Sequence, residues 1–424
     1  MQFVDLVSNN VKTTFIKTNK FKTISINVVF LGEFSKENAT RRSLLARMLP
    51  FSLKKYPTKK DINNKLNELY DMGMSVSSYP TYKTNMTSFS VDYVKPEYIN
   101  TGENLHAEAI AILRELIFNP NIKKGGFNKK LFKEQKNILK QNIINIYNNK
   151  NRYAIRQLLN HMGKDEITSV SALGNLDDLE LIDEKNLYNT YKDIIESEKA
   201  SIIVIGDFDD DVMLENLKLL GDFKNNDLNL EVVSNEEKQI EEVKELVEKQ
   251  NINQAKLIMG FRTSVNSIDE LYPASLVFNA MFGGTFQSDL IRVVREENSL
   301  AYTIASQAIS DLKLLIVTAG IDSSKYEMTK NLVIAQLNNY KNGELSAANM
   351  RLAKESLITE LIEIEDNQNA VMSFYFKNHL YGVAEDVVDL IEKIKNVSLD
   401  DIKAVAQGIN LDTVFLLASE DYDG

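Results

Sequence analysis

The pattern of hydrophobic and polar positions runs through the same order of elements twice. Each half opens with an apolar, strand-like segment, continues with helical spacing, a β-rich stretch and an amphipathic helix, and closes on an apolar strand. These segments are residues 21–32, 41–51, 74–94, 105–116 and 201–207 in the first half, and 254–263, 271–282, 302–320, 332–337 and 413–418 in the second. The pattern predicts a tandem duplication of a unit of about 200 residues, far longer than a solenoid repeat.

The order of the elements also indicates the fold class. Strands and helices do not alternate strictly, which favours an α+β fold over a doubly wound parallel sheet. We therefore expect two homologous domains, each a mainly antiparallel sheet flanked by helices, over residues 1–222 and 251–424. Residues 223–250 are rich in Asn, Asp, Glu and Lys, a composition typical of a charged linker.

Composition excludes several classes of protein. The chain has 424 residues, of which 44% are hydrophobic and 26% charged, as in ordinary globular proteins. Its net charge of −11 argues against nucleic-acid binding, which requires a basic face. Cysteine is absent, and neither a secretory signal nor an apolar run of membrane-spanning length is present. We expect a cytoplasmic protein without a membrane partner.

One predicted helix has the surroundings of a metal motif without its ligands. Residues 43–51 read Ser-Leu-Leu-Ala-Arg-Met-Leu-Pro-Phe. This run resembles the N-terminal motif of the pitrilysin/insulinase family of zinc peptidases, in which His-x-x-Glu-His precedes Met-Leu-Phe. By this resemblance Ser43, Ala46 and Arg47, here called the motif positions, stand where the family has two histidines and a glutamate.

The remaining metal ligand of that family is also missing. It is a glutamate that lies seven residues after another acid on a later helix, and the resemblance places these residues at Glu134 and Gln141. The chain has three histidines: His106, His161 and His379. None has a second histidine about one helical turn away, the spacing that would place two imidazoles on one helix face as zinc ligands. We therefore expect no cofactor in this chain.

A second run of residues is similar to the C-terminal signature of the same family. Residues 279–284 read Asn-Ala-Met-Phe-Gly-Gly, and residues 294–302 read Val-Arg-Glu-Glu-Asn-Ser-Leu-Ala-Tyr. In the family, an arginine and a tyrosine seven residues apart reach the zinc site of the other half, where they hold the substrate and the developing oxyanion. Arg295 and Tyr302 match them, and both residue types can stabilise such charge. The alternative is structural, with Arg295 paired to Glu296 or Glu297 and Tyr302 packed at the start of a strand.

The resemblance implies a function in a pair. Smaller bacterial members of the family include a metal-free chain that joins a motif-bearing subunit, with zinc in the partner and an extended peptide as substrate. This chain resembles the metal-free member found in Gram-positive bacteria, which implies a heterodimer closing like a clamshell. The peptide would add to an edge strand at residues 76–81, which contains Ser77 and Ser78, while Pro80 removes one backbone donor there.

Two further readings compete with this one. The chain could be a purely structural or peptide-binding family member without peptidase activity, as are the family's subunits in respiratory complexes. An enzyme with a different chemistry has little support, because the chain has no Cys, no Ser-His-Asp spacing and no acid pair with a visible role.

Overall fold

The computed structural model describes residues 1–99, 104–164, 166–224, 226–383 and 385–422. It divides into two compact units. The first consists of Met1–Ile144, Val170–Glu231 and Gln368–Met372, and the second of Asn145–Ser169, Val232–Asn367 and Ser373–Gly424.

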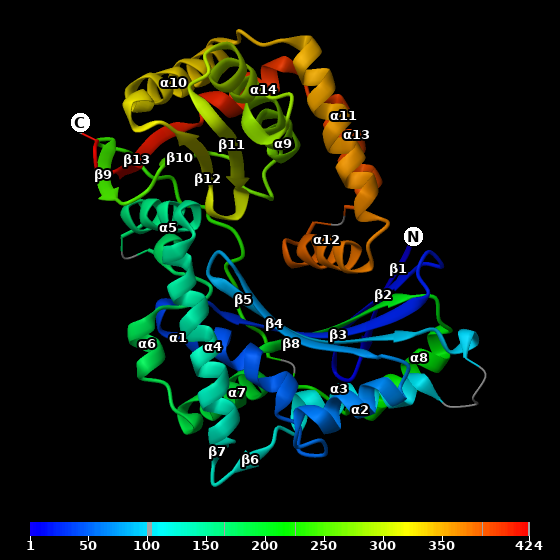
Figure 1. The fold of residues 1–424 in the computed structure, drawn as a ribbon. Coiled ribbons are helices and arrows are strands. Elements are labelled where there is room, and N and C mark those ends of the chain that lie inside the picture. Colours follow the sequence, from blue (N-terminus) through cyan, green and yellow to red (C-terminus); the bar gives the residue numbers. More distant parts are fainter. Residues whose placement is uncertain (100–103, 165, 225, 384, 423–424) are drawn as a thin grey trace. The chain divides into compact units, whose positions relative to one another are not determined.

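A twisted sheet forms the centre of the first unit (Figure 1). Within the described residues it has six strands in the order β1-β2-β8-β3-β5-β4. Only β2 and β8 pair in parallel, and the other neighbours are antiparallel. The strands are β1 (Gln2–Ser8), β2 (Val11–Lys17), β3 (Thr23–Glu33), β4 (Gly73–Thr81), β5 (Thr84–Val94) and β8 (Lys199–Gly206).

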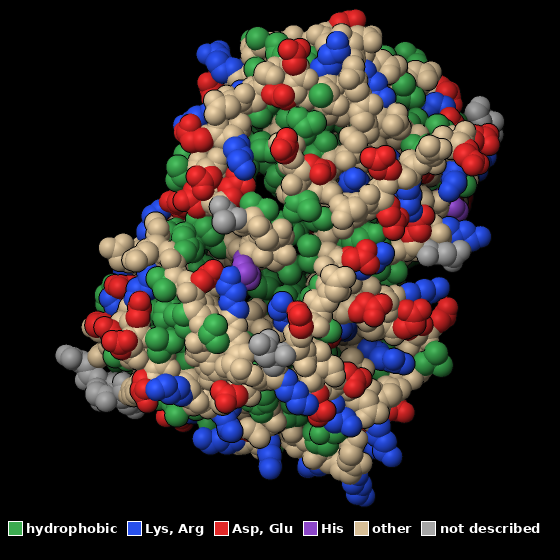
Figure 2. Space-filling view, turned by 180° about the vertical axis from the view of Figure 1, so that it is seen from behind, with side chains coloured by type: hydrophobic (Ala, Val, Ile, Leu, Met, Phe, Trp, Pro, Cys, Tyr) green, Lys and Arg blue, Asp and Glu red, His purple; other side chains and the backbone are tan. Residues whose placement is uncertain are grey.

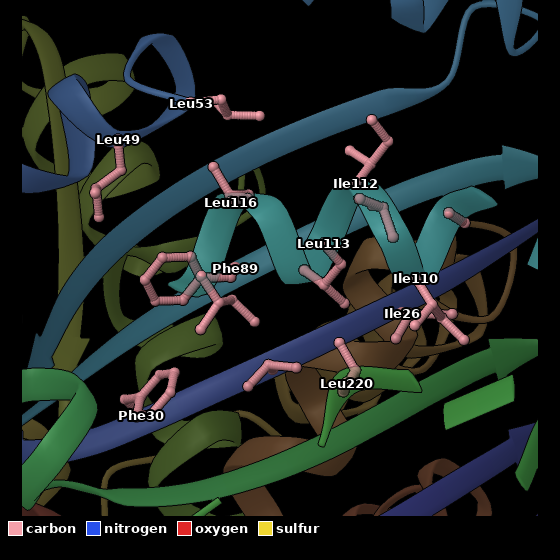
Figure 3. Close-up of a cluster of buried hydrophobic side chains, with 14 of the residues drawn as sticks. Ile26, Phe30, Leu49, Leu53, Phe89, Ile110, Ile112, Leu113, Leu116 and Leu220 are labelled. Carbon is pink, nitrogen blue, oxygen red and sulfur yellow. The ribbon is translucent and has the colours of Figure 1, made fainter. Parts of the chain in front are cut away.

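Helices on one face of this sheet bury its core (Figures 1 and 3). Ile110 and Leu113 of α3 lie over Ile26 of β3, and all three side chains are fully buried. Each contributes about 1.5–3 kcal/mol by its removal from water. The helices of this unit are α1 (Lys36–Met48), α2 (Lys59–Glu68), α3 (Leu105–Phe118), α4 (Lys129–Asn148), α6 (Leu176–Glu180), α7 (Glu184–Ser197) and α8 (Asp210–Leu217), and a short hairpin joins β6 (Ile122–Lys123) to β7 (Gly126–Phe127).

The second unit repeats this topology. Its sheet has five strands among the described residues, in the order β11-β12-β10-β13-β9, and again only one pair, β13 with β9, is parallel. The order β4-β5-β3-β8-β2 of the first sheet matches it strand for strand. The predicted α+β duplication is therefore confirmed. The strands are β9 (Lys244–Gln250), β10 (Ala255–Arg262), β11 (Ala301–Ile309), β12 (Leu314–Ile321) and β13 (Asn410–Ser419).

Both faces of the second sheet are covered. Leu257 and Met259 of β10 belong to a core beneath α9, α10 and α14, whereas Ile258 between them packs with Leu158 and Met162 of α5. This alternation follows from the two-residue period of a strand. The helices are α5 (Lys150–Met162), α9 (Tyr272–Asn279), α10 (Tyr326–Asn342), α11 (Ala347–Ile364), α13 (Val387–Asn396), α14 (Leu399–Gln407) and the part of α12 (Gln368–Leu380) that follows Met372. Two π-helical segments are η5 (Ala280–Gly284) and η6 (Ile291–Glu297).

Two features differ from the simple division expected along the chain. Helix α5 comes from the first half of the sequence, yet its apolar face packs on β10 and β13, so it belongs to the second unit. The segment expected to be a linker ends in β9, which extends the second sheet beside β13. Residue 225 of that segment lies outside the described residues.

Candidate functional site

Helix α1 carries the motif positions. Ser35 caps its first turn in a reciprocal arrangement with Asn38, and Pro50 lies in the 3-10 turn that follows its end. Ser43 is buried, while Ala46 and Arg47 are half-buried. None of the three side chains is an imidazole or a carboxylate, and Arg47 adds a positive charge. This donor set does not fit a zinc ion.

Arg47 instead connects α1 to α4. With the Asn142 amide turned so that its oxygen faces Arg47, both guanidinium Nη atoms lie 3.0 Å from that oxygen and donate to it. Gln141, expected at the ligand position, is exposed, and Glu134 pairs with Lys59 at 2.5 Å. The α4 residue that meets the motif positions is therefore Asn142, joined to α1 through a guanidinium rather than through a metal.

A buried ion pair lies beside the motif positions. Arg42 of α1 donates to Glu198, which directly precedes β8, and their side chains are only 7% and 9% exposed. Burial raises the pKa of Glu198, although the charge of Arg42 opposes that shift. Gly32 of β3 makes room for the pair, because a Cβ there would collide with the Glu198 carboxylate. The pair fixes α1 against the sheet.

The three histidines lie on three different helices, α3, α5 and α12. Tyr93 Oη lies 2.7 Å from His106 Nδ1, and burial lowers the pKa of His106, with Glu97 opposing. Over the part of the chain that the structure describes, no group of three or more His, Asp or Glu side chains is placed to hold a metal ion.

Arg295 and Tyr302 lie on adjoining elements of the second unit. Arg295 belongs to η6, a π-helix, a rare conformation that often marks functional sites. Tyr302 lies near the start of β11, where Ala301 pairs with Ile321 but Thr303 pairs with Gly320. Tyr302 is thus the extra residue of a β-bulge, which re-aims a side chain.

Both side chains are exposed, Tyr302 at 65%. Within the described ranges, neither the Arg295 guanidinium nor the Tyr302 hydroxyl forms a hydrogen bond or ion pair with the protein. Glu297, a carboxylate close to Arg295 in sequence, pairs with Arg292 at 2.6 Å. The structure therefore leaves a cationic and a phenolic group available on two adjoining elements of the second unit.

Ser77 and Ser78 lie on β4, the outermost strand of the first sheet. Ser77 Oγ lies 2.7 Å from the Tyr79 hydroxyl, and Ser78 Oγ donates to Asn85 Oδ1 at 3.1 Å. In the described part of the chain, β4 pairs only with β5, so its other edge is open. An open edge can accept an added strand.

Charge on the surface is mixed. On the face shown in Figure 2, Lys and Arg side chains are interspersed with Asp and Glu over most of the described area. None of the described helices combines the length and apolarity needed to cross a membrane.

Comparison with known proteins agrees with this geometry. A family model described as the peptidase M16 inactive domain matches residues 182–357. The probable inactive metalloprotease YmfF of Bacillus subtilis is 29% identical over 403 residues, which cover 95% of this chain and 94% of that protein. The crystal structure of a conserved protein from Enterococcus faecalis has a TM-score of 0.93 at 25% identity, covering 100% of this chain and 99% of that one.

Residues 182–357 match the peptidase M16 inactive domain, and the chain resembles M16 proteins along nearly its whole length. The resemblance predicted from the motif positions and the Arg/Tyr signature is thereby confirmed, and both the matched domain and the Bacillus subtilis relative are described as inactive. A protease from Helicobacter pylori shares the fold, with a TM-score of 0.79 at 14% identity over 98% of this chain and 99% of that one.

Sequence reasoning missed two features of the M16 scaffold in this chain. Gln135 and Asn142 are also seven residues apart, and Gln135 is buried whereas Glu134 is exposed. The buried stripe of α4 could have indicated this register, because Phe132, Gln135 and Leu139 share its inward face. The Arg42–Glu198 pair carries no sequence signal, since 156 residues separate its members.

Proposed function

We propose that this chain is the zinc-less subunit of a heterodimeric M16 endopeptidase. The partner is a motif-bearing M16 chain that holds the zinc ion, and the substrate is an extended peptide. Arg295 and Tyr302 complete the partner's active site by stabilising the charge that develops on the carbonyl oxygen. Both subunits act in the cytoplasm.

The observation that carries this proposal is that Arg295 and Tyr302 have no role inside their own unit. Their side chains are exposed and make no hydrogen bond or ion pair with described residues, yet they lie on a π-helix and on a β-bulge, two conformations common at functional sites. A guanidinium and a phenol are donors suited to an oxyanion. The described residues include no group of side chains placed to hold a metal ion, so in this proposal the ion and its water belong to the partner.

The first unit supplies a surface for the peptide. Strand β4 has an open edge, and an extended peptide can pair with such an edge through its backbone. Ser77 and Ser78 would contact the peptide side chains. Pro80, near the end of β4, cannot donate a backbone hydrogen bond.

The test is a peptide-cleavage assay on the complex formed with the His-x-x-Glu-His-bearing product of the neighbouring gene. Removal of one oxyanion donor costs about 2.7–4 kcal/mol, or about 10²- to 10³-fold in kcat. We expect losses of this size for Tyr302→Phe and Arg295→Ala. Arg295→Lys should be nearly as damaging, because an ammonium lacks the planar fork. Arg351→Ala, an exposed arginine on α11, and Gln307→Ala, an exposed residue on β11, are the matched controls.

Two outcomes would contradict the proposal. If the purified chain stays separate from the motif-bearing chain in size measurements, the heterodimer does not exist. If a folded, partner-bound Arg295→Ala/Tyr302→Phe variant keeps its kcat/KM, the two groups have no catalytic part. That second result would favour the structural alternative, for which the likeness in fold to a chain of complex III from Candida albicans (TM-score 0.71, 14% identity) is a precedent.

A further inference from the structure

The π-helix that carries Arg295 is held at both ends. A π-helix is rare and usually forms only a short segment, so the side-chain contacts that support one are informative. In η6 this support begins with Arg292, which donates to Asp289 Oδ1 at 2.8 Å and to Glu297 Oε1 at 2.6 Å. Glu297 follows Arg292 by five residues, the spacing that brings side chains one turn apart in a π-helix.

The buried end of this network is anchored in the core. Tyr340 of α10 donates its hydroxyl hydrogen to Asp289 Oδ2 at 2.6 Å, and the two residues are only 1% and 7% exposed. The rings of Phe278 and Phe282 pack edge-on against the Tyr340 ring, with centroids 5.3 and 5.6 Å away. Tyr340 therefore cannot move without disturbing the core, and it fixes Asp289. Asp289, Arg292, Glu297 and Tyr340 are here called the η6 clamp.

The exit from the π-helix is fixed as well. Asn298 Nδ2 donates to the carbonyl oxygen of Val293 at 2.8 Å, and the Leu300 amide donates to that of Val294 at 2.9 Å. Ser299 adopts a left-handed conformation (φ 51°), and its carbonyl oxygen accepts a hydrogen bond from Lys325 Nζ at 2.7 Å. The backbone between Arg295 and Tyr302 thus follows one defined path.

The clamp also decides which arginine of η6 stays free. Side chains two residues apart on a helix do not face each other, but Glu297 is the last residue of η6, so its carboxylate, if released, could turn towards the Arg295 guanidinium. Arg292 holds that carboxylate instead, and Arg292 in turn has two carboxylate partners whereas Arg295 has none among the described residues. An arginine already paired twice has few donors left for a substrate oxygen, whereas an unpaired one has all five.

We propose that Tyr340, Asp289 and Arg292 are positioning residues, which fix the direction of Arg295 and keep Glu297 away from it. This inference rests on the proposed function, because the reaction it serves is that of the partner's zinc site. The clamp residues do not touch the substrate. They act through η6 by setting where one guanidinium points and by leaving it without a carboxylate partner.

The first experiment measures peptide cleavage by the complex carrying Tyr340→Phe, which keeps the ring among its aromatic neighbours and removes only the hydroxyl. We expect kcat to fall by about 10- to 100-fold, since a misplacement of about 1 Å costs about 10²-fold, with KM little changed. The matched control is Tyr326→Phe. Tyr326 is also a buried tyrosine of α10, and its hydroxyl donates to a carboxylate at 2.9 Å, that of Glu245, outside the clamp. Equal activities of Tyr340→Phe and Tyr326→Phe would overturn the proposal.

The second experiment asks for rescue, which a merely structural role would not give. Arg292→Ala releases Glu297, so kcat should fall, and adding Glu297→Gln should restore part of it because the competing charge is gone. In an Arg295→Ala background, Arg292→Ala should cause little further loss. Equal activities of Arg292→Ala and Arg292→Ala/Glu297→Gln would contradict the role assigned to Glu297.

The third measurement needs no partner and separates the two proposals. Hydrogen exchange of the isolated chain should be faster over residues 291–300 in Tyr340→Phe than in Tyr326→Phe. Unchanged exchange overturns the clamp whatever the activity. If exchange rises but Arg295→Ala leaves kcat/KM of the complex unchanged, the proposed function fails, and with it the positioning role. If Arg295→Ala lowers kcat while the clamp variants match their control, the proposed function stands and the clamp alone is rejected.

Discussion

Replacement of Arg42 by alanine should destabilise the first unit by about 3–5 kcal/mol, the usual cost of leaving one member of a buried ion pair unpaired. Glu198 is 9% exposed, and its Oε2 already lacks a hydrogen-bond partner among the described residues, so the carboxylate would lose the cation that pairs with it, while the charge of Asp193 would remain nearby. A loss of this size is a large share of the stability of a typical domain, about 5–15 kcal/mol.

The same reasoning predicts the double replacement. Two guanidinium nitrogens of Arg42 are also buried without partners in the described structure, so the pair is poorly compensated for its loss of water. Arg42→Met combined with Glu198→Leu should therefore restore stability to about the original level or slightly above it. Adding the stability losses of the two single variants would greatly overestimate the loss in the double variant, as expected when two residues interact directly.

The pH dependence gives an independent check. Burial raises the pKa of Glu198 in the folded chain, so the folded state binds its proton more readily than the unfolded state does. The ionised Glu198 carboxylate therefore destabilises the fold fully at a pH above its pKa in the folded state. This destabilisation is lost as the pH falls through the pKa of Glu198 in the unfolded state. Without Arg42 that pKa rises further. The Arg42→Ala defect should therefore be smaller at pH 5 than at pH 8.

Urea unfolding followed by circular dichroism measures these changes, with hydrogen exchange over α1 and β8 to assign the loss to the first unit. Arg41→Ala is the matched control, because Arg41 is the neighbouring arginine of α1, is partly exposed and forms no ion pair with described residues. Its expected effect is within about 0.5 kcal/mol. A difference between Arg42→Ala and Arg41→Ala below that amount, or an Arg42→Ala defect that grows towards acid pH, would show that the buried pair does not stabilise the fold in this way.

Two further predictions concern the metal and the peptide. The chain purified from zinc-containing medium should hold no stoichiometric zinc by elemental analysis. Placing His, Glu and His at the motif positions should create zinc binding when combined with Asn142→Glu, because Asn142 faces α1, but not when combined with Gln141→Glu. Equal zinc content in these two variants would contradict this geometry. Pro80→Ala should tighten the binding of a labelled extended peptide, because it restores a backbone donor to β4; fluorescence anisotropy measures the affinity. If the affinity of Pro80→Ala is unchanged in an experiment with Tyr79→Ala as the control, the result counts against strand addition at this edge.

The central strands could be predicted from sequence because they are buried, and the edge strand β4 is expected within residues 74–94, but the outer strand β9 could not be predicted. β3 and β10 are mainly apolar and are buried along nearly their whole length, and their composition and length identify them. β9 reads Lys-Glu-Leu-Val-Glu-Lys-Gln, and most of its side chains are exposed. Natural edge strands carry charge that discourages further pairing, so their composition resembles that of a linker. Only the partner strand β13 reveals that this segment extends the sheet.

The ligand position on α4 shows a different limit. A spacing of seven residues is satisfied equally by Glu134 with Gln141 and by Gln135 with Asn142, and one residue of shift rotates a side chain by about 100° around a helix. The family pattern favoured the first pair because it keeps an acid. The contact between Arg47 and Asn142, and the burial of Gln135, favour the second. Neither observation is available without coordinates.

The choice between Arg292 and Arg295 depends on backbone geometry in the same way. On an ordinary α-helix Arg292 would face Glu296, four residues on, and Glu297 would lie to one side. In the π-helical turn Arg292 reaches Glu297 instead, and Asp289 and Tyr340 hold it there. The sequence pattern Arg-Glu-Glu does not show which of these charged side chains form ion pairs with each other. The conformation settles that question, since it pairs one arginine twice and leaves the next one, a single turn away, with its charge and donors exposed.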